Sequence, residues 1–345
     1  MEHEITARGA LLDASGSLRE PGWARSLLLD YDRAAIRAPA WRIKEWDYYC
    51  VVCGDYALAC TIADNGYMGF FSASVLDFAA GSNATDEVMT PFPMGRVGLP
   101  RSSAEGTSSI EAKGASIRFE AGGGKRRISI SWPGFRAGKG SPPAGLEAEI
   151  LLSERPRGDS MVIATPFAGA PRAFYYNQKI NCQDAEGSFK FGQRVFPVER
   201  GRAFGCLDWG RGVWTWSNTW YWGSASGLAG GSSFGFNIGH GFGDTGAASE
   251  NMVFHEGVAH KIGRLEIELD HRDFMKPWRA RSEDGRLDLT LEPLLDRQSK
   301  TDLGILASIQ HQVFGDWSGR ATLDDGKTVE FSGLRGWCEK VINRW

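Results

Sequence analysis

Hydrophobic and polar residues alternate strictly along many short segments of the chain. Residues 116–120, 128–132 and 146–150 carry an apolar side chain at every second position, and the same period recurs at 265–270 and 287–292. A period of two is typical of antiparallel strands that pack one face on a core and turn the other to solvent. The pattern therefore predicts strands at intervals through both halves of the chain.

Turn-forming residues separate these apolar runs. Asn65-Gly66 and Asp324-Asp325-Gly326 each lie between two β-branched or aromatic segments, as in tight hairpins. Convincing helical periodicity is absent almost everywhere in the sequence. Short strands joined by turns favour packed barrels or sandwiches over a parallel α/β sheet. We therefore expect an all-β fold of two packed antiparallel barrel or sandwich domains with few helices.

Chain length and local composition indicate two domains. The 345 residues exceed one ordinary domain of about 100–200 residues. A polar turn at 155–159 and a Gly/Ala/Pro-rich segment at 166–171 place the expected boundary between domains 1–165 and 166–345. Gly, Ser, Pro and Thr are frequent at positions 79–115, which predicts a long loop or a lid there.

Charge and hydropathy exclude several classes of function. The 39 basic and 42 acidic residues give a net charge of −3, which offers no electrostatic footprint for DNA or RNA. No run approaches the roughly 20 apolar residues that a membrane-spanning helix needs. The charged N-terminus lacks the apolar region of a signal peptide. We expect a soluble, cytoplasmic protein with no nucleic-acid partner and no membrane span, while its oligomeric state stays open.

Cysteine and glycine patterns argue against a metal or a nucleotide cofactor. Six cysteines are scattered along the chain, which favours free thiols in a chain of this length. Cys50 and Cys53 have the spacing of a zinc or redox pair, but no second half follows, and strand geometry directs them to opposite faces. No glycine pattern for dinucleotides or phosphates follows a strand and opens a helix. We expect no cofactor and no metal, and a small-molecule ligand or substrate as the partner.

The stretch from Asp208 to Trp222 differs from ordinary core sequence. Five of the 13 tryptophans lie between positions 209 and 222, beside one aspartate and one arginine. Buried tryptophan usually finds a partner for its indole N–H, and Asp or Arg is almost never fully buried unless it is paired. The stretch therefore predicts the lining of a pocket at the beginning of the second domain.

Several motifs follow one another along nearly the whole chain in the order of a known family. They include Trp46-Asp-Tyr-Tyr49, Asn177-Gln-Lys179, Asp208-Trp-Gly-Arg-Gly-Val-Trp214, Lys276-Pro-Trp-Arg279 and Gln312-Val-Phe-Gly315. In this order the chain resembles a bacterial family known only as domain of unknown function 2804. The family name supplies no activity.

A weaker resemblance is to the carotenoid hydratase and AttH-like group, whose members have two lipocalin-like β domains. Asp208-Trp209-Gly210, followed by Thr219-Trp-Tyr-Trp222, is similar to that group's Asp-His-x-aromatic-Gly and Gly-Trp-Asp-Trp motifs, although Trp209 replaces the histidine. The resemblance implies lipocalin-like domains and a pocket for a small, often hydrophobic molecule. In enzymes of the group a carboxylic acid protonates an alkene. Other members are dehydratases, cyclases or lipid carriers, so the fold alone does not select an activity.

Asp208 is the principal candidate for chemistry. A carboxyl beside Trp209 and Trp214 would be desolvated, which raises its pKa and makes it a general acid near neutral pH. The alternative is a salt bridge between Asp208 and Arg211 that ties the strand end to its neighbour. That pairing would leave the carboxyl unable to donate a proton.

Other titratable residues could assist Asp208. Asp244 and Glu250 follow a glycine-rich bend and could supply the second carboxylate that glycoside hydrolysis requires, or they could cap turns. His240 lies within that bend, and His311 lies near the C-terminus; either could shuttle a proton near pH 7, although a lone histidine is more often structural. The candidate catalytic residues are thus Asp208, Asp244, Glu250 and His240.

Aromatic and polar side chains complete the predicted pocket. The face of an indole ring stabilises a nearby cation by about 0.5 to 2 kcal/mol, and it also stacks on sugar rings. The tryptophans could equally form a core between the two domains. Lys179 would be the counter-charge of a carboxylate. The candidate substrate-binding residues are Trp209, Arg211, Trp214, Trp220, Trp222, Tyr176, Lys179, Asn237 and His311.

Three functions would use this pocket. The first is a cofactor-independent, acid-catalysed enzyme of the hydratase, dehydratase, isomerase or cyclase type, in which Asp208 protonates a small, largely apolar molecule. The second is a glycoside-active enzyme with Asp208 and either Asp244 or Glu250 as a carboxylate pair. The third is a non-catalytic, lipocalin-like binding protein.

Overall fold

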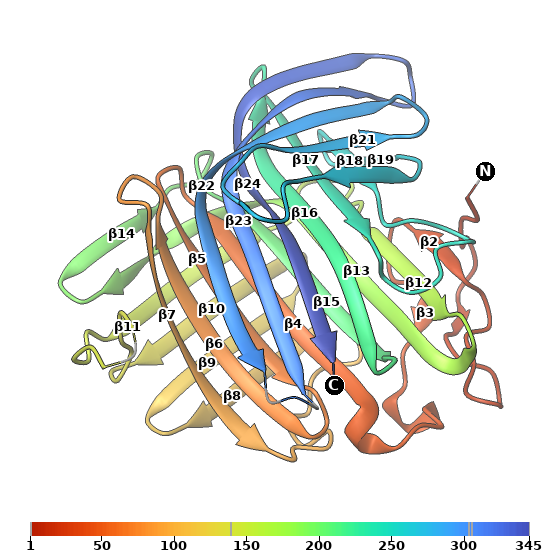
Figure 1. Cartoon of the computed structure of the whole chain (residues 1–345), viewed down its shortest axis with the longest axis horizontal. Coiled ribbons are helices and arrows are strands. Elements are labelled where there is room, and N and C mark those ends of the chain that lie inside the picture. Colours follow the sequence, from red (N-terminus) through yellow and green to blue (C-terminus); the bar gives the residue numbers. More distant parts are fainter. Residues whose placement is uncertain (1, 139, 303, 305, 345) are drawn as a thin grey trace.

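Strands account for nearly all of the regular structure. The computed structural model describes residues 2–138, 140–302, 304 and 306–344, which form 24 strands (Figure 1). The other regular elements are two single-turn 3₁₀ helices, η1 (Arg33–Ala35) and η2 (Ala40–Arg42). The predicted all-β class is therefore confirmed for the described residues.

The larger of the two main sheets has 13 strands, and ten of them follow one antiparallel path. Its order is β7-β6-β5-β4-β15-β13-β11-β10-β9-β8, while β12 and β14 pair with β13, and β2 pairs with β12. The strands of this sheet are β2 (Gly22–Ala24), β4 (Ile43–Val52), β5 (Tyr56–Asp64), β6 (Met68–Asp77), β7 (Ser82–Pro91), β8 (Gly106–Ala112), β9 (Ala115–Gly122), β10 (Lys125–Trp132), β11 (Leu146–Ser153), β12 (Met161–Phe167), β13 (Ala170–Phe191), β14 (Arg194–Val198) and β15 (Phe204–Val213). Two short strands, β1 (Gly9–Ala10) and β3 (Leu29–Asp30), pair in parallel in the N-terminal arm.

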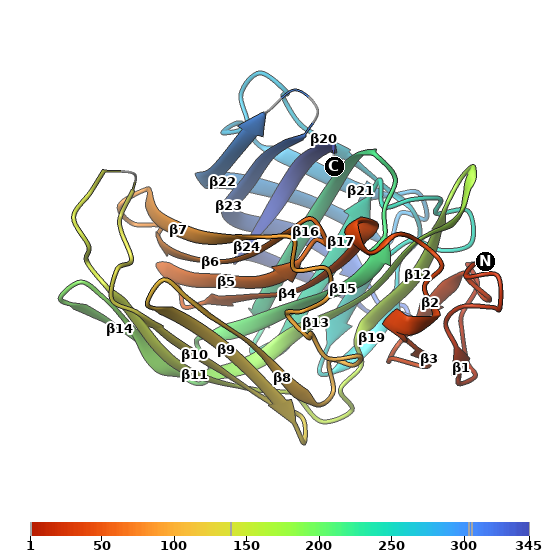
Figure 2. The same cartoon turned by 90° about the horizontal axis from the view of Figure 1, so that it is seen from below.

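This path curls into a nearly closed barrel whose free edges are β7 and β8 (Figure 2). Its interior is filled by the apolar members of the alternating segments, such as Ile117 and Phe119 of β9 and Ile128 and Ile130 of β10, which are all buried. The alternation with a period of two has the predicted effect, because every second side chain of these strands points into the barrel.

The second sheet is an open half-barrel of nine antiparallel strands. Its order is β19-β18-β17-β16-β24-β23-β22-β21-β20. The strands are β16 (Ser217–Ala229), β17 (Ser232–His240), β18 (Met252–His255), β19 (Val258–Lys261), β20 (Leu265–Glu268), β21 (Trp278–Ser282), β22 (Leu287–Asp302), β23 (Ala307–Thr322) and β24 (Thr328–Arg344). Phe236, Trp278, Leu289 and Trp317 are buried in its own core.

Strands β4 to β7 lie between the second sheet and strands β8 to β11 (Figure 2). The outer face of one barrel wall is thus turned toward β22, β23 and β24. The chain passes from the first sheet to the second between Val213 and Ser217, so the change of sheet does not coincide with the boundary expected at 165/166. The Pro/Gly-rich residues near that position form the tight connection between β12 and β13, which pair through Phe167 and Ala170.

The segment expected to be a long loop or lid contains two strands instead. Residues 82–91 form β7 and residues 106–112 form β8, and only the connection between them is irregular. In β7 only Ala84 and Val88 are buried, so the apolar alternation that identifies a strand is too sparse to outweigh the Gly, Ser and Thr around it.

Candidate functional site

A cavity of about 440 Å³ lies between the two sheets. One wall is the outer face of β4 to β7, and the other is formed by β16 and β22 to β24. Met68, Phe70 and Val341 are among its apolar lining residues, and Gln310 and Gln312 are among the polar ones. Pockets of about 300–1,000 Å³ with mainly apolar walls are typical of small-molecule sites. Five of the predicted site residues line this cavity: Lys179, Asp208, Trp214, Trp220 and Trp222.

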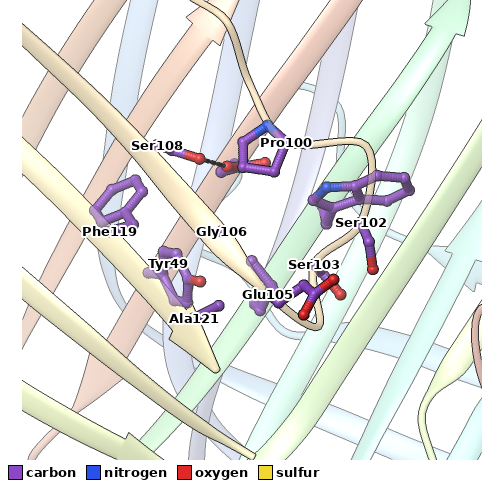
Figure 3. Close-up of a pocket in the computed structure, with 12 residues that line it drawn as sticks. Tyr49, Pro100, Ser102, Ser103, Glu105, Gly106, Ser108, Phe119 and Ala121 are labelled. Atoms are coloured by element: carbon purple, nitrogen blue, oxygen red, sulfur yellow. Dashed lines mark hydrogen bonds between the residues drawn. The ribbon is translucent and has the colours of Figure 1, made fainter. Parts of the chain in front are cut away.

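Strand β15 divides its side chains between this cavity and the barrel interior. Asp208 lines the cavity, and Trp209 points to the opposite side, as strand alternation requires. Trp209 lines a space of only about 10 Å³ inside the barrel, together with Tyr49 and Ser108 (Figure 3). That space has room for about one water molecule. The barrel is thus filled, and the space for a ligand lies outside it.

Arg211 completes a polar network on the barrel side of β15. Its buried guanidinium donates to the Asp47 carboxylate at 3.0 Å and to the backbone carbonyls of Trp46 at 2.7 Å and Pro100 at 2.9 Å. It also lies over the Trp209 ring at 4.3 Å. The alternative pairing of Arg211 with Asp208 does not form, because residues three apart in a strand point to opposite faces. Arg211 therefore stabilises the barrel and does not line the cavity.

Tyr176 also belongs to the barrel side. Its buried hydroxyl donates to the backbone carbonyl of Leu29 at 2.8 Å, and its ring packs edge-on against Trp209 at 5.7 Å. Tyr176 thus fastens the N-terminal arm to the barrel.

Asp208 and Lys179 form an ion pair at the cavity wall. They are direct register partners on β15 and β13, and the Lys179 ammonium lies 2.8 Å from the Asp208 carboxylate. The side-chain amide of Asn177 donates to the other carboxyl oxygen at 2.6 Å. Both partners are donors, and one of them is a cation, so the Asp208 carboxyl group is held by a direct ion pair as well as by a hydrogen bond. The ammonium also lies over the Trp222 ring, 4.0 Å from its centre.

The three predicted tryptophans that line the cavity are held by contacts with their neighbours. Trp214 and Trp220 pack edge-on with their ring centres 5.1 Å apart. The indole N–H of Trp222 donates to the side-chain oxygen of Asn237 at 2.7 Å, and the Asn237 amide donates in turn to the backbone carbonyl of Glu250 at 2.8 Å. Asn237 is fully buried and orients the Trp222 ring from behind, and it is not itself among the lining residues.

Glu339 on β24 lines the cavity as well, and it was not among the residues predicted from the sequence. One of its carboxyl oxygens accepts from the indole N–H of Trp220 at 3.1 Å. The other accepts from the side-chain amides of Gln310 at 3.0 Å and Gln312 at 3.1 Å. Trp337, Glu339 and Val341 alternate on one strand face, so a glutamate within an otherwise apolar row is the sequence signal that points to it.

Burial raises the pKa of Glu339 above its usual value. Hydrogen bonds from Trp220 and Gln310 and the positive charges of Lys179 and Arg297 oppose this rise, but they do not cancel it. The donors that would stabilise the Glu339 carboxylate after transfer of its proton are already in place.

Glu250 lies behind the same wall without lining the cavity. It is buried, one of its carboxyl oxygens has no hydrogen-bond partner, and the other is 3.5 Å from the Tyr175 hydroxyl. Burial raises the pKa of Glu250 to about 8. Gly239 makes room for this carboxyl, since a Cβ atom there would lie 1.7 Å from the Glu250 Oε1 atom.

Three further predicted residues lie outside the cavity lining. Asp244 is exposed and accepts from the backbone N–H of Gly246 at 2.9 Å, as a turn cap does. His240 is exposed and stacks on Tyr221 with ring centres 6.2 Å apart. A ring nitrogen of His311 lies 2.7 Å from the Asp296 carboxylate, and its ring stacks on Phe274 at 3.8 Å. The structure brings none of the three to Asp208.

Among the described residues, no group of three or more His, Cys, Asp or Glu side chains is arranged to hold a metal ion. In the same part of the chain, no helix is long and apolar enough to cross a membrane. All six cysteines are free.

A barrel and a half-barrel with a cavity between them define a lipocalin-like all-β fold, and solved structures share this fold. CghA has a TM-score of 0.57 at 10% identity, over 100% of this chain and 97% of that chain. CghA with Sch210972 has a TM-score of 0.54 at 11% identity, over 88% of each chain. Kievitone hydratase from Nectria haematococca has a TM-score of 0.55 at 12% identity, over 87% of this chain and 88% of that chain. An AttH-like protein from Nitrosomonas europaea has a TM-score of 0.51 at 13% identity, over 90% and 96%.

The family described as Domain of unknown function (DUF2804) matches residues 2–345, so the chain belongs to this family. A search by sequence among curated proteins gives no match. Both resemblances predicted from the motifs are thus confirmed, the first as family membership and the second at the level of the fold.

Proposed function

We propose that this protein is a cofactor-independent enzyme in which Glu339 protonates a small, largely apolar molecule bound in the cavity between the sheets. One observation carries the proposal: a buried carboxyl with a raised pKa lines the cavity and is surrounded by three hydrogen-bond donors. A general acid needs a proton at working pH and a stable conjugate base after transfer. Burial, which raises the pKa of Glu339, favours the first requirement, and the three donors favour the second.

The balance of charge supports Glu339 over Asp208 as the donor. The Lys179 ammonium pairs directly with Asp208, and its charge also acts on Glu250 and Glu339. Buried charges are costly unless they are paired, and this ammonium is paired directly with Asp208, whereas burial raises the pKa of Glu250 and Glu339. In this arrangement Asp208 holds Lys179, and Lys179 can orient an oxygen of a substrate or of a water molecule.

The aromatic walls suit a reaction that passes through positive charge. Trp220 donates to Glu339, Trp214 packs against Trp220, and Tyr48 lies on the opposite wall. The faces of such rings stabilise a cation by about 0.5 to 2 kcal/mol. Protonation of an alkene or of a leaving hydroxyl by Glu339 would form that cation, and the Glu339 carboxylate would recover a proton from the product. This chemistry covers hydratase, dehydratase, isomerase and cyclase reactions, and the fold shared with kievitone hydratase is compatible with it.

A glycoside-active enzyme has less support. The pair expected for it combines Asp208 with Asp244 or Glu250, and neither of the latter two lines the cavity. A binding protein without catalysis would use the same cavity, so it must be separated by experiment.

The test combines identification of a ligand with loss of turnover. Native mass spectrometry of the purified protein, followed by denaturation and small-molecule analysis, identifies a co-purifying compound and guides screening with terpenoid and glycoside panels. Glu339→Gln keeps the shape of the side chain and removes the acid, so turnover should fall about 10²- to 10⁴-fold. Glu330→Gln, an exposed position on the same strand, is the matched control and should keep full turnover. Full turnover in Glu339→Gln would exclude this mechanism, and ligand capture without any turnover would favour the binding protein.

A further inference from the structure

Arg297 joins the two walls of the cavity. It extends from β22, is half-buried, and lines the cavity. Its guanidinium donates to the hydroxyl of Ser74 on β6 at 2.8 Å, across the gap between the sheets. A guanidinium has five N–H donors, and this contact uses one of them.

The guanidinium of Arg297 forms no direct ion pair with a carboxylate among the described residues. The other two cationic side chains that line the cavity are paired, Lys179 with Asp208 at 2.8 Å and Arg344 with Asp302 at 3.4 Å. Within the described residues, no carboxylate oxygen lies within 4.0 Å of the guanidinium of Arg297. The charge of Arg297 acts on the Glu339 carboxyl group from beyond ion-pair distance, and arginine in a partly buried site is normally paired directly, so the Arg297 guanidinium has room for a counter-ion in the cavity.

A second polar group near Arg297 also lacks a partner. Gln312 is the register partner of Arg297 on the neighbouring strand, it is 1% exposed, and it lines the cavity. Its side-chain amide donates to Glu339, but its carbonyl oxygen is buried without a hydrogen bond among the described residues. Buried polar atoms are nearly always satisfied in folded proteins, so an unpartnered acceptor beside an unpaired cation marks a place for a bound group.

We propose that the cavity binds an amphipathic anion, with its acidic oxygen on Arg297 and its apolar body against Met68, Phe70 and Val341. The Gln312 carbonyl would accept from a hydroxyl or N–H beside that acidic group. A carboxylate or enolate suits the planar donor fork of arginine, which binds two oxygens at once. This inference names the substrate class of the proposed function and rests on the same cavity.

Two fluorescent probes that differ by one charge test the proposal. 8-Anilinonaphthalene-1-sulfonate is an anion, and N-phenyl-1-naphthylamine has the same rings without the sulfonate. Fluorescence titrations of both are compared for the wild type, Arg297→Gln, Arg297→Lys and Arg281→Gln. The last is the matched control, since Arg281 is an arginine of the same sheet that is paired with Asp288 and does not line the cavity.

Arg297→Gln should weaken binding of the anionic probe about ten- to a hundredfold, the range for a hydrogen bond to a charged group. The neutral probe should change less than about twofold, which also reports that the variant is folded. The affinity of Arg297→Lys for the anionic probe should lie between those of Arg297→Gln and the wild type. Arg281→Gln should bind both probes as the wild type does. Added salt should weaken the binding of the anionic probe and leave the binding of the neutral probe unchanged.

An equal loss of affinity for both probes in Arg297→Gln would overturn the proposal, because it would mean that Arg297 only connects the two sheets. Unchanged binding of the anionic probe would overturn it as well. These outcomes are independent of turnover, so they remain distinct from a failure of Glu339 as the acid.

Discussion

The ammonium of Lys179 lies 2.8 Å from the carboxylate of Asp208, and the two residues face each other on adjacent strands of the barrel wall. Their side chains are only 1% and 11% exposed. Removal of one member of such a pair leaves the other charge buried and unpaired. Asp208→Asn should therefore lower the free energy of unfolding by roughly 3–5 kcal/mol, as measured by urea denaturation.

The control for this prediction is Asp244→Asn, a change to an exposed turn, which should cost less than about 1 kcal/mol. Combining Asp208→Asn with Lys179→Met should restore part of the lost stability, because the double variant has no unpaired charge. Equal stability of Asp208→Asn and the control would contradict the importance of the pair.

Glu250 should make the stability of the protein depend on pH. Burial raises the pKa of Glu250 to about 8, compared with 4.5 when it is free. Below pH 4.5 both folded and unfolded chains hold this proton. As the pH rises from 4.5 to 8, the unfolded chain loses the proton while the folded chain retains it, so the free energy of unfolding falls. Above pH 8 both chains are deprotonated at this residue, and the free energy of unfolding falls no further on its account.

Glu250→Gln removes the titrating carboxyl group. The fall in the free energy of unfolding with pH should therefore be smaller in the variant by a few kcal/mol, at about 1.36 kcal/mol per pKa unit. Urea denaturation at pH 5, 7 and 8.5 measures the effect. The variant should gain stability over the wild type mainly at pH 8.5. Parallel pH profiles for the two proteins would show that Glu250 does not titrate as stated.

Gly210 should be intolerant of a side chain. A Cβ atom at this position would lie 2.1 Å from the indole ring of Trp46, its register partner, which stacks on Tyr175 and packs against Trp214. Gly210→Ala would therefore displace a ring of the cavity wall. We expect a loss of about 1–3 kcal/mol in the free energy of unfolding, together with weaker binding of the neutral probe.

Gly122→Ala is the matched comparison for Gly210→Ala. Nothing lies within 4 Å of a Cβ atom at Gly122, which is also at the end of a strand. Its stability and probe binding should stay close to those of the wild type. If Gly210→Ala behaved in the same way, the Trp46 ring could not be as tightly confined as its contacts indicate.

The pH dependence of catalysis should follow Glu339. The proposed reaction needs its neutral acid, and burial raises the pKa of this carboxyl above the usual value of 4.5. The value of kcat/KM should thus be constant at low pH and fall on the alkaline side of a pKa higher than 4.5. A plot of kcat/KM against pH for the identified substrate checks this. A rate that rises through that range would indicate a base in place of an acid.

Strand pattern and motifs predicted much of the fold. The alternating segments at 117–119 and 128–130 fill the barrel as expected, because a period of two can bury only one face. Sequence patterns did not reveal where one sheet ends, since the turn between β12 and β13 resembles a linker in composition. They also did not separate the barrel interior from the space between the sheets, because both are lined by aromatic residues.

This ambiguity explains the mixed outcome for the site. Asp208, Trp214, Trp220, Trp222 and Lys179 reach the cavity, as a pocket-lining stretch should. Neighbouring members of the same motif, such as Trp209 and Arg211, point into the barrel, and the sequence alone does not say which face is which. Glu339 comes from a strand more than 100 residues further along the chain, and only the pairing of β16 with β24 brings it beside Trp220.

Strand β15 separates the barrel interior from the cavity between the sheets. These two spaces differ in how much substitution of their lining residues they can accept. On the barrel side almost no space remains, so larger residues there would strain the wall and smaller ones would leave voids. On the other side, Gln298, Ser299 and Thr301 of β22 line the cavity and are exposed. New ligand preferences within this family can therefore arise by substitution in the second sheet, while the barrel keeps the ion pair and the tryptophans in position.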